Sequence, residues 1–168
     1  MIPFNKPYFS GREMTYIEQV CHSTTMSGNG EFTKLCHSFF EKKYDFKKCL
    51  LCTSGTDALE MCAMLCELKP GDEVIVPSYT FVSTALAFLR EGAYVRFADS
   101  SAKNPNMTVE QIEPLINENT RVIVVVHYAG ISCDMDAIMA LAKKYNLLVV
   151  EDAAHSIDSF YKGKPLGG

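Results

Sequence analysis

The stretch LLVVEDAAHS, residues 147–156, carries an apolar segment directly into two acidic side chains. Its first four residues, Leu147–Val150, have the pattern of a short buried strand. Glu151 and Asp152 follow at the tip of that strand. A carboxylate in such a place is costly unless it has a partner. The segment therefore points either to a bound ligand or to a turn that an acidic residue caps.

Short apolar segments alternate with helical patterns through most of the chain. We expect strands at residues 48–53, 73–77, 94–99, 121–126 and 147–152. We expect helices between them at residues 56–68, 80–92, 107–116 and 134–146. Continuous apolar strands are typical of a sheet that is covered on both faces. The pattern predicts an α/β fold with a mostly parallel sheet and helices on both faces.

The first 47 residues have a different organisation. An arm leads into an expected helix at residues 11–21, and the glycine-rich loop SGNGEF, residues 27–32, precedes a second helix. Five residues of that second helix fall on one apolar face, which we expect to be core: Phe32, Leu35, Cys36, Phe39 and Phe40. We divide the chain into an N-terminal arm with helices, residues 1–47, and a sheet domain, residues 48–168.

Composition excludes several classes of protein. The chain has 168 residues, a net charge of −4 and 48% hydrophobic residues, which is typical of one globular core without a nucleic-acid or membrane partner. No apolar run approaches the ~20 residues that span a bilayer, and the N-terminus has no signal-peptide pattern. Seven cysteines, mostly in apolar patterns, indicate reduced, buried thiols and a cytoplasmic location. Cys49 and Cys52 form a C-x-x-C without further ligands at metal spacing, so we expect no metal site.

Parallel sheets bind ligands beyond the carboxyl ends of their strands, so residues that follow the strands are the functional candidates. Thr53-Ser54-Gly55-Thr56 opens a helix and is either a cap or an anion site, since helix N-termini expose N–H groups. Phe81 either stacks on a flat ring or packs in the core, and packing is favoured from the residue alone. His127 is either a catalytic base or a structural histidine that bonds a backbone carbonyl, and we favour the structural role.

The helix at residues 107–116 is capped by Thr108 or, alternatively, by Asn106.

The segment EDAAH, residues 151–155, gives the sharpest chemical hypothesis. An ionised Asp152 can hold a proton on a heteroaromatic nitrogen, and in pyridoxal phosphate chemistry that pairing makes the ring an electron sink. Ala153 and Ala154 leave room for a ring, and His155 can bond its phenolic oxygen or the substrate. The alternatives are an acid that caps a turn and a surface histidine. A nucleoside-triphosphate loop and a dinucleotide site are disfavoured, because neither G-x-x-x-x-G-K-[ST] nor a G-x-G-x-x-G after a strand is present.

Taken together, the motifs resemble the DegT/DnrJ/EryC1/StrS family of sugar aminotransferases. The matching stretches are SGTDAL, KPGDEVIVPSYTFVSTA, RVIVVVHYAG, LLVVEDAAHS and YKGKPLG, in the same order and spacing. The resemblance covers nearly the whole chain. It implies the large domain of a fold type I enzyme that depends on pyridoxal 5′-phosphate, present here in part.

The resemblance also implies roles for individual residues. Gly55 and Thr56 contact the cofactor phosphate, and Phe81 stacks on the pyridine ring. Asp152 pairs with the pyridine nitrogen, and His155 lies beside the ring oxygen. Asp152 and His155 are the implied catalytic residues of this chain.

The family's lysine, which bonds covalently to the cofactor, lies in an S-F-H-x-x-K-like stretch that this chain does not contain. Lys162 and Lys164 belong instead to the Y-K-G-x-x-x-G segment that precedes it. We therefore expect the chain to be the N-terminal part of an enzyme of about 370–400 residues, to make only non-covalent contacts with the cofactor, and to be inactive alone.

The implied reaction transfers an amino group from glutamate to the keto carbon of a nucleotide-linked sugar. The opening MIPFNKP and the SGNGEFT loop resemble most the branch that aminates a TDP-4-keto-6-deoxyhexose to TDP-4-amino-4,6-dideoxygalactose, for enterobacterial common antigen and related surface glycans. The resemblance also implies a homodimer. Two alternatives stay open: a dehydratase of the same family, in which histidine replaces the lysine, and a non-catalytic α/β module that binds a phosphorylated ligand.

Overall fold

The computed structural model describes residues 2, 3 and 5–168. The described residues form two compact units, one ending at Leu51 and the other spanning Cys52–Gly168. Each unit is described by itself.

The N-terminal unit contains α1, Glu13–His22, and α2, Glu31–Tyr44, which confirms the two expected helices. The apolar core expected on α2 is wrong for three of its five residues, since Leu35, Cys36 and Phe39 are exposed, whereas Phe32 and Phe40 are half-buried. Tyr44 is the buried residue of α2, and its ring stacks between those of Phe40 and Phe46 at centroid distances of 5.8 and 5.3 Å. Two helices are too few to enclose a full apolar face of one of them.

The second unit is built on a parallel sheet of four strands. These are β1, Glu73–Pro77, β2, Tyr94–Ala98, β3, Thr120–Val126, and β4, Leu148–Asp152, in the order β2-β1-β3-β4. The chain places β2 on one side of β1 and then returns to place β3 on the other side. The direction of winding therefore switches between β1 and β3, which is where sheets of this class bind ligands.

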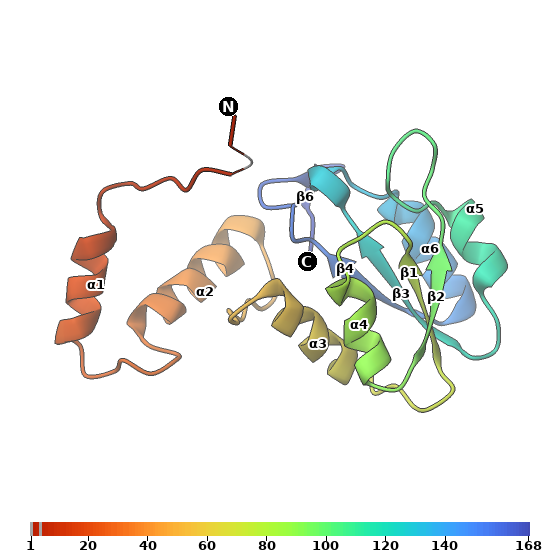
Figure 1. Ribbon diagram of the computed structural model, residues 1–168, viewed down its shortest axis with the longest axis horizontal. Helices are drawn as coiled ribbons and strands as arrows, with labels where there is room; N and C mark the ends of the chain where they lie inside the picture. Colours follow the sequence, from red (N-terminus) through yellow and green to blue (C-terminus); the bar gives the residue numbers. More distant parts are fainter. Residues whose placement is uncertain (1, 4) are drawn as a thin grey trace. The chain divides into compact units, whose positions relative to one another are not determined.

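Helices cover both faces of this sheet (Figure 1). Val74, Val76 and Val124 pack with α3, Gly55–Leu65, and α4, Ser83–Arg90. On the opposite face, Ile75, Ile123 and Val125 pack with α5, Val109–Ile112, and α6, Met135–Tyr145. Successive residues of β1 and β3 thus alternate between the two cores, as the period of a strand requires. The predicted α/β fold, parallel sheet and two covered faces are confirmed.

The strand expected at residues 48–53 is wrong, since no strand forms there. The N–H group of Cys49 donates to Oε1 of Glu41 at 3.1 Å, and that of Leu51 donates to Nε2 of His37 at 2.9 Å. Side chains of α2 thus occupy the backbone donors that a sheet ladder would use.

The helix expected at residues 107–116 divides into α5 and the 3₁₀ turn η1, Glu113–Leu115, which contains Pro114. Proline lacks the N–H group that a continued α-helix needs. Thr108 is the N-cap, in a capping box with Gln111, so the first of the two expected caps is confirmed. Asn106, the alternative, is buried and bonds another loop.

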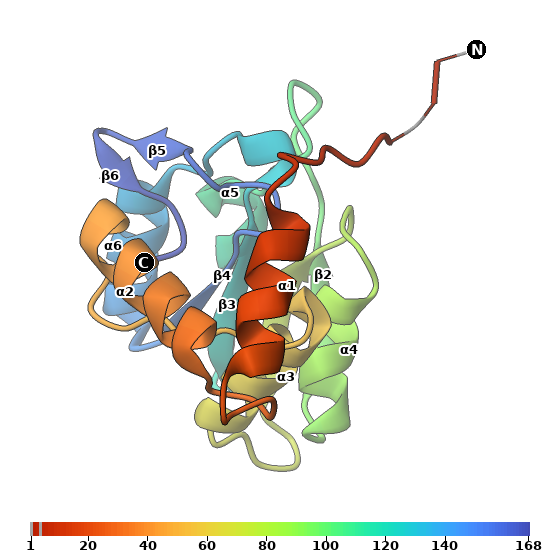
Figure 2. The same ribbon diagram turned by 90° about the vertical axis from the view of Figure 1, so that its left-hand side faces the viewer.

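A two-stranded hairpin, β5, Phe160–Tyr161, with β6, Lys164–Pro165, follows the sheet (Figure 2). The Tyr161 hydroxyl donates to Oδ1 of Asp134, the N-cap of α6, at 2.7 Å. Lys162 binds the Asp136 carboxylate in the first turn of the same helix. These contacts hold the hairpin at the N-terminal end of α6.

All seven cysteines are free thiols. Only Cys133 is buried, so the expectation of buried thiols is wrong for three that are exposed: Cys21, Cys36 and Cys52. Burial, together with the nearby Glu151 carboxylate, raises the pKa of the Cys133 thiol to about 12. That thiol is protonated at neutral pH and is not a nucleophile.

We predict that Ile138→Ala lowers the free energy of unfolding by about 2–5 kcal/mol, because Ile138 of α6 is fully buried against the sheet. Its neighbour Met139 is exposed, and Met139→Ala should change the same quantity by less than about 0.5 kcal/mol. Urea denaturation of the two variants measures both values. Equal losses would contradict the described packing of α6.

Candidate functional site

Three turns lie at the carboxyl edge of the sheet, around the switch point. Ser78–Phe81 follows β1, η2, Tyr128–Gly130, follows β3, and Ala153–His155 follows β4. Parallel strands end at the same edge, so these turns are neighbours in space. The candidate site is built from their side chains and from the N-terminus of α3.

Asp152 lies at the tip of β4 and is half-buried. The Thr84 hydroxyl, from the first turn of α4, donates to its Oδ2 at 2.8 Å, and the Ala154 N–H donates to its Oδ1 at 3.3 Å. Thr84 is fully buried, and the Thr80 hydroxyl lies 2.8 Å from its oxygen, where it donates because the proton of Thr84 is already used. Across residues 2, 3 and 5–168, Asp152 forms no ion pair with a lysine, arginine or histidine.

Phe81 lies in the turn before α4, where the N–H of Thr84 donates to the Phe81 carbonyl at 3.1 Å. The Phe81 side chain is 71% exposed. The packing interpretation, favoured from the residue alone, is therefore wrong for the described residues. An exposed aromatic ring therefore lies at the same edge of the sheet as a carboxylate that has no cationic partner among the described residues.

The N-terminus of α3 is capped by Ser54, whose hydroxyl accepts from the Asp57 N–H at 3.1 Å. The cap interpretation of the TSGT segment is thus confirmed, with Ser54 as the capping residue. Gly55 and Thr56 occupy the first turn, whose N–H groups have no intrahelical acceptor. A Cβ built on Gly55 would meet no atom within 4 Å, so space above this helix end is open.

Asp57 lies in this first turn as well, and hydrogen bonds with Thr53 and Ser54 lower the pKa of its carboxyl group. No hydrogen bond between described residues joins Gly55 or Thr56 to Phe81, Asp152 or His155.

His127 is fully buried at the end of β3. Its Nδ1 accepts from the Cys133 N–H at 3.2 Å, so the neutral ring carries its proton on Nε2, which donates to Oε2 of Glu151 at 2.7 Å. The Gly167 N–H donates to the same oxygen at 3.0 Å. The structural role expected for His127 is confirmed, although its partners are a carboxylate and an N–H group and not a carbonyl.

Glu151 therefore has a structural role, because its partners are the buried His127 and a backbone N–H group. Burial raises the pKa of the Glu151 carboxyl, but hydrogen bonds from His127 and Gly167 lower it, and the net pKa lies below its ordinary value. Glu151 joins β4 to β3 and to the segment after the hairpin.

His155 is exposed in the turn after β4. Its Nδ1 accepts from the Ala129 N–H at 3.2 Å, and its ring meets the edge of the Tyr128 ring at a centroid distance of 5.5 Å. Tyr128 in turn packs on Tyr79, with centroids 4.8 Å apart and hydroxyl oxygens 3.3 Å apart. Sequence reasoning did not single out Thr84. Tyr79 and Tyr128 were among the candidate residues that follow the strands, but the sequence assigned neither of them a role.

The ammonium group of Lys162 is occupied by contacts with neighbouring side chains. The pKa of its ammonium group is raised, because Asp136 and Tyr161 accept hydrogen bonds from it. This arrangement agrees with the interpretation of Lys162 as part of the hairpin.

Two further features are absent from the part of the chain that the structure describes. No group of three or more His, Cys, Asp or Glu residues there could hold a metal ion. No helix there combines the length and the apolar character that crossing a membrane requires.

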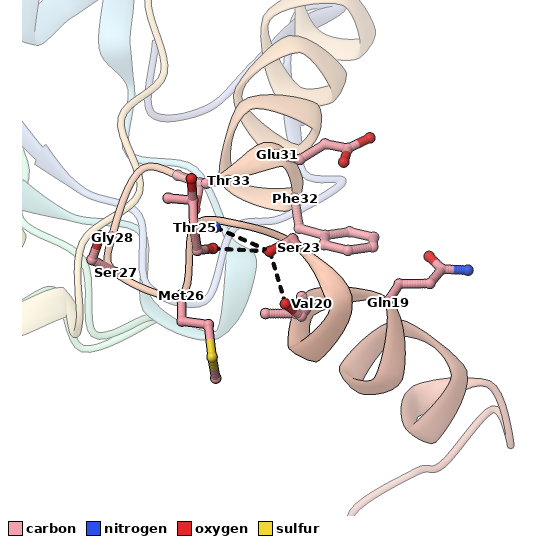
Figure 3. A pocket seen from close by; sticks show the side chains of 11 residues that line it. Gln19, Val20, Ser23, Thr25, Met26, Ser27, Gly28, Glu31, Phe32 and Thr33 are labelled. Atoms are coloured by element: carbon pink, nitrogen blue, oxygen red, sulfur yellow. Dashed lines mark hydrogen bonds between the residues drawn. The ribbon is translucent and has the colours of Figure 1, made fainter.

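The N-terminal unit has an open hollow of about 500 Å³ between the end of α1 and the start of α2 (Figure 3). It is lined by the loop at residues 23–30, where the Ser23 hydroxyl bonds the Val20 and Thr25 carbonyls. Its polar side chains are largely exposed.

The model of the DegT/DnrJ/EryC1/StrS aminotransferase family matches residues 7–168 of the chain. The chain belongs to this family. The resemblance that the motifs carried is thereby confirmed.

Two curated relatives of the chain are named for different nucleotide sugars. GDP-perosamine synthase of Escherichia coli O157:H7 is 35% identical over 99% of this chain and 46% of its own length. UDP-N-acetyl-3-dehydro-alpha-D-glucosamine 3-aminotransferase of Acidithiobacillus ferrooxidans is 45% identical over 69% of this chain and 31% of its own length. The chain thus spans less than half the length of these relatives.

Solved structures share the fold closely. The aminotransferase from Psychrobacter cryohalolentis has a TM-score of 0.92 and 35% identity over 98% of this chain and 42% of its own. Spr1654 of Streptococcus pneumoniae, assigned as a sugar aminotransferase and solved in its PLP-form, has a TM-score of 0.92 and 31% identity over 99% of this chain and 46% of its own.

We predict that Glu151→Gln destabilises the protein at neutral pH and that the difference shrinks on acidification. A carboxyl group whose folded pKa is depressed stabilises the fold above its unfolded pKa, about 4.3, and loses that effect as pH falls through the lower folded pKa. Urea unfolding of both proteins between pH 7 and pH 3 measures the difference.

The exposed Glu118 provides the control, since Glu118→Gln should change the free energy of unfolding by less than about 0.5 kcal/mol across this range. A Glu151→Gln effect that is independent of pH would show that the His127–Glu151 contact does not depend on the charge.

Proposed function

We propose that this chain is the cofactor-binding part of a pyridoxal-phosphate-dependent aminotransferase that acts on nucleotide-linked keto sugars. The observation that carries the proposal is the Asp152 carboxylate. It is half-buried, held by two neutral donors and without a cationic partner among the described residues, and an exposed aromatic ring lies at the same edge of the sheet. Membership in the family supports the proposal.

The residues at the edge fit the cofactor in three respects. Open space above Gly55, at the positive end of an eleven-residue helix, suits the phosphate group. The exposed Phe81 ring suits a flat pyridine face. The unpaired charge of Asp152 suits a protonated ring nitrogen, which would supply the missing cation.

Each of these residues has a distinct task. Asp152 holds a proton on the ring nitrogen, and Thr84 fixes the direction in which the carboxylate points, because its hydroxyl binds Oδ2. The first-turn N–H groups of Gly55 and Thr56 bind an anion, and His155 bonds an oxygen at the ring's edge. When bound, pyridoxal phosphate supplies an electron sink for transfer of the amino group.

The proposed reaction moves an amino group from glutamate to the keto carbon of the sugar. The relatives named for GDP- and UDP-linked sugars support a nucleotide sugar as the substrate class. Within that class we propose a TDP-4-keto-6-deoxyhexose, for synthesis of a surface glycan, by a cytoplasmic homodimer. Incubating the whole protein with glutamate and TDP-, UDP- or GDP-linked keto sugars, and identifying products by mass, tests this choice.

Each product has a defined meaning. An amino sugar formed fastest from the TDP-linked substrate supports the full proposal, and faster amination of another nucleotide form keeps the reaction but replaces the nucleotide. Loss of a hydroxyl group without gain of nitrogen indicates the dehydratase alternative. Binding of the cofactor without turnover of any sugar indicates the non-catalytic module.

We predict that Asp152→Asn lowers glutamate-dependent amination by the whole protein by about 10²-fold or more, because a neutral amide cannot hold the proton on the ring nitrogen. Asp72→Asn is the matched control. Asp72 lies just before β1, at the opposite edge of the sheet, and pairs with Arg121. The Asp72→Asn variant should aminate the sugar at an unchanged rate. Initial rates and circular dichroism of both variants measure activity and fold, and full turnover by a folded Asp152→Asn variant would refute the role.

We predict that Gly55→Ala weakens the binding of pyridoxal 5′-phosphate without destabilising the fold. The new methyl group meets no protein atom within 4 Å, but it occupies the space through which the phosphate approaches. Fluorescence titration with the cofactor and thermal unfolding measure the two effects. Gly28, in the loop before α2, is equally unobstructed, so Gly28→Ala serves as the control.

An unchanged cofactor affinity in Gly55→Ala would contradict the proposed phosphate site.

A further inference from the structure

The turn that follows β3 has an unusual backbone. Ala129 adopts a left-handed conformation, with φ of 53° and ψ of 26°, and Gly130 follows with φ of 76°. A non-glycine residue in this region is uncommon, because its Cβ approaches the following carbonyl oxygen. Strain of this kind persists only where the surrounding contacts maintain it.

The left-handed turn directs one backbone group at the candidate site. The N–H of Ala129 donates to Nδ1 of His155 at 3.2 Å. The two turns approach so closely that a Cβ on Gly130 would lie 2.8 Å from Oγ of Ser159 and 3.0 Å from the His155 carbonyl oxygen. Glycine is thus required where η2 meets the turn after β4.

Asn106 holds the turn from the other side. It is 4% exposed, and its two side-chain groups bind both ends of the turn: Oδ1 accepts from the Tyr128 N–H at 3.1 Å, and Nδ2 donates to the Ile131 carbonyl at 2.7 Å. A buried amide that satisfies one donor and one acceptor fixes the backbone between them. The Tyr128 ring adds an edge-on contact with the His155 ring.

We infer that this clamped turn sets the tautomer of His155, with Asn106 and Ala129 as positioning residues. A backbone N–H can only donate, so Nδ1 of His155 carries a lone pair and the neutral ring carries its proton on Nε2. Nε2 forms no hydrogen bond to any described residue. His155 therefore presents a donor to the site, and it favours ligands with an oxygen acceptor there over ligands whose group at that place can only donate, such as an ammonium group. This consequence rests on the proposed function, whereas the tautomer itself does not.

The test is the tautomer of His155 in the cofactor-free protein, above the pH at which the ring becomes neutral. Long-range ¹H–¹⁵N spectra of protein labelled at its histidine side chains distinguish protonated from unprotonated ring nitrogens, and the His155→Gln variant identifies the signals. We expect the Nε2–H form in the wild-type protein. A predominant Nδ1–H form would overturn the inference.

Three variants test what maintains this tautomer. Ala129→Pro removes the donating N–H and also the left-handed conformation, because proline fixes φ at about −65°, and Asn106→Leu removes the clamp at similar volume. In each, the ratio of Nε2–H to Nδ1–H should fall about fivefold, the equivalent of one ordinary hydrogen bond. Ala129→Gly keeps the N–H and accepts the left-handed conformation, so its ratio should equal that of the wild type.

If Ala129→Pro does not fold, Asn106→Leu and the wild-type spectrum still decide the question. An unchanged ratio in a folded Asn106→Leu or Ala129→Pro variant would overturn the role of the turn. Because no cofactor or sugar is present, failure here is distinguishable from failure of the proposed aminotransferase activity.

Discussion

The hydrogen bond from Thr84 to Asp152 is the contact on which the candidate site depends. It joins the first turn of α4 to the tip of β4, across 68 residues of sequence, and one of its partners is fully buried. The hydroxyl is a neutral donor, and no cationic side chain of the described residues pairs with Asp152. The N–H of Thr84 also donates to the Phe81 carbonyl, so Thr84 connects the turn that carries the exposed aromatic ring to the Asp152 carboxylate.

The two neighbouring acids at the end of β4 show how environment divides roles. Glu151 points to the interior, where His127 and the Gly167 N–H bind it, and it connects strand ends to each other. Asp152 instead accepts from neutral donors only, the Thr84 hydroxyl of α4 and the Ala154 N–H of the following turn. In a strand, successive side chains face opposite sides, so one strand tip supplies a structural carboxylate and, in our proposal, a cofactor-binding one. The sheet's switch point brings the turns after β1 and β3 to the same place.

The parallel sheet was predictable because its apolar, β-branched segments carry their own signal, and the strand tips followed from it. The strand expected at residues 48–53 failed because Glu41 and His37, remote in sequence, take its backbone donors. The roles of Thr84 and Asn106 were beyond sequence reasoning, since each depends on a tertiary approach between distant segments. The left-handed Ala129 was equally hidden, because the residue type argues against that conformation.

The central claim is that this sheet edge binds pyridoxal phosphate through Asp152 and the N-terminus of α3. A crystal structure of the protein grown with pyridoxal 5′-phosphate tests it most directly. The account predicts electron density in which the ring nitrogen lies within hydrogen-bond distance of the Asp152 carboxylate, the ring lies against Phe81 and the phosphate meets the Gly55 and Thr56 N–H groups. Density for the cofactor elsewhere, with Asp152 contacting only solvent, would contradict the account.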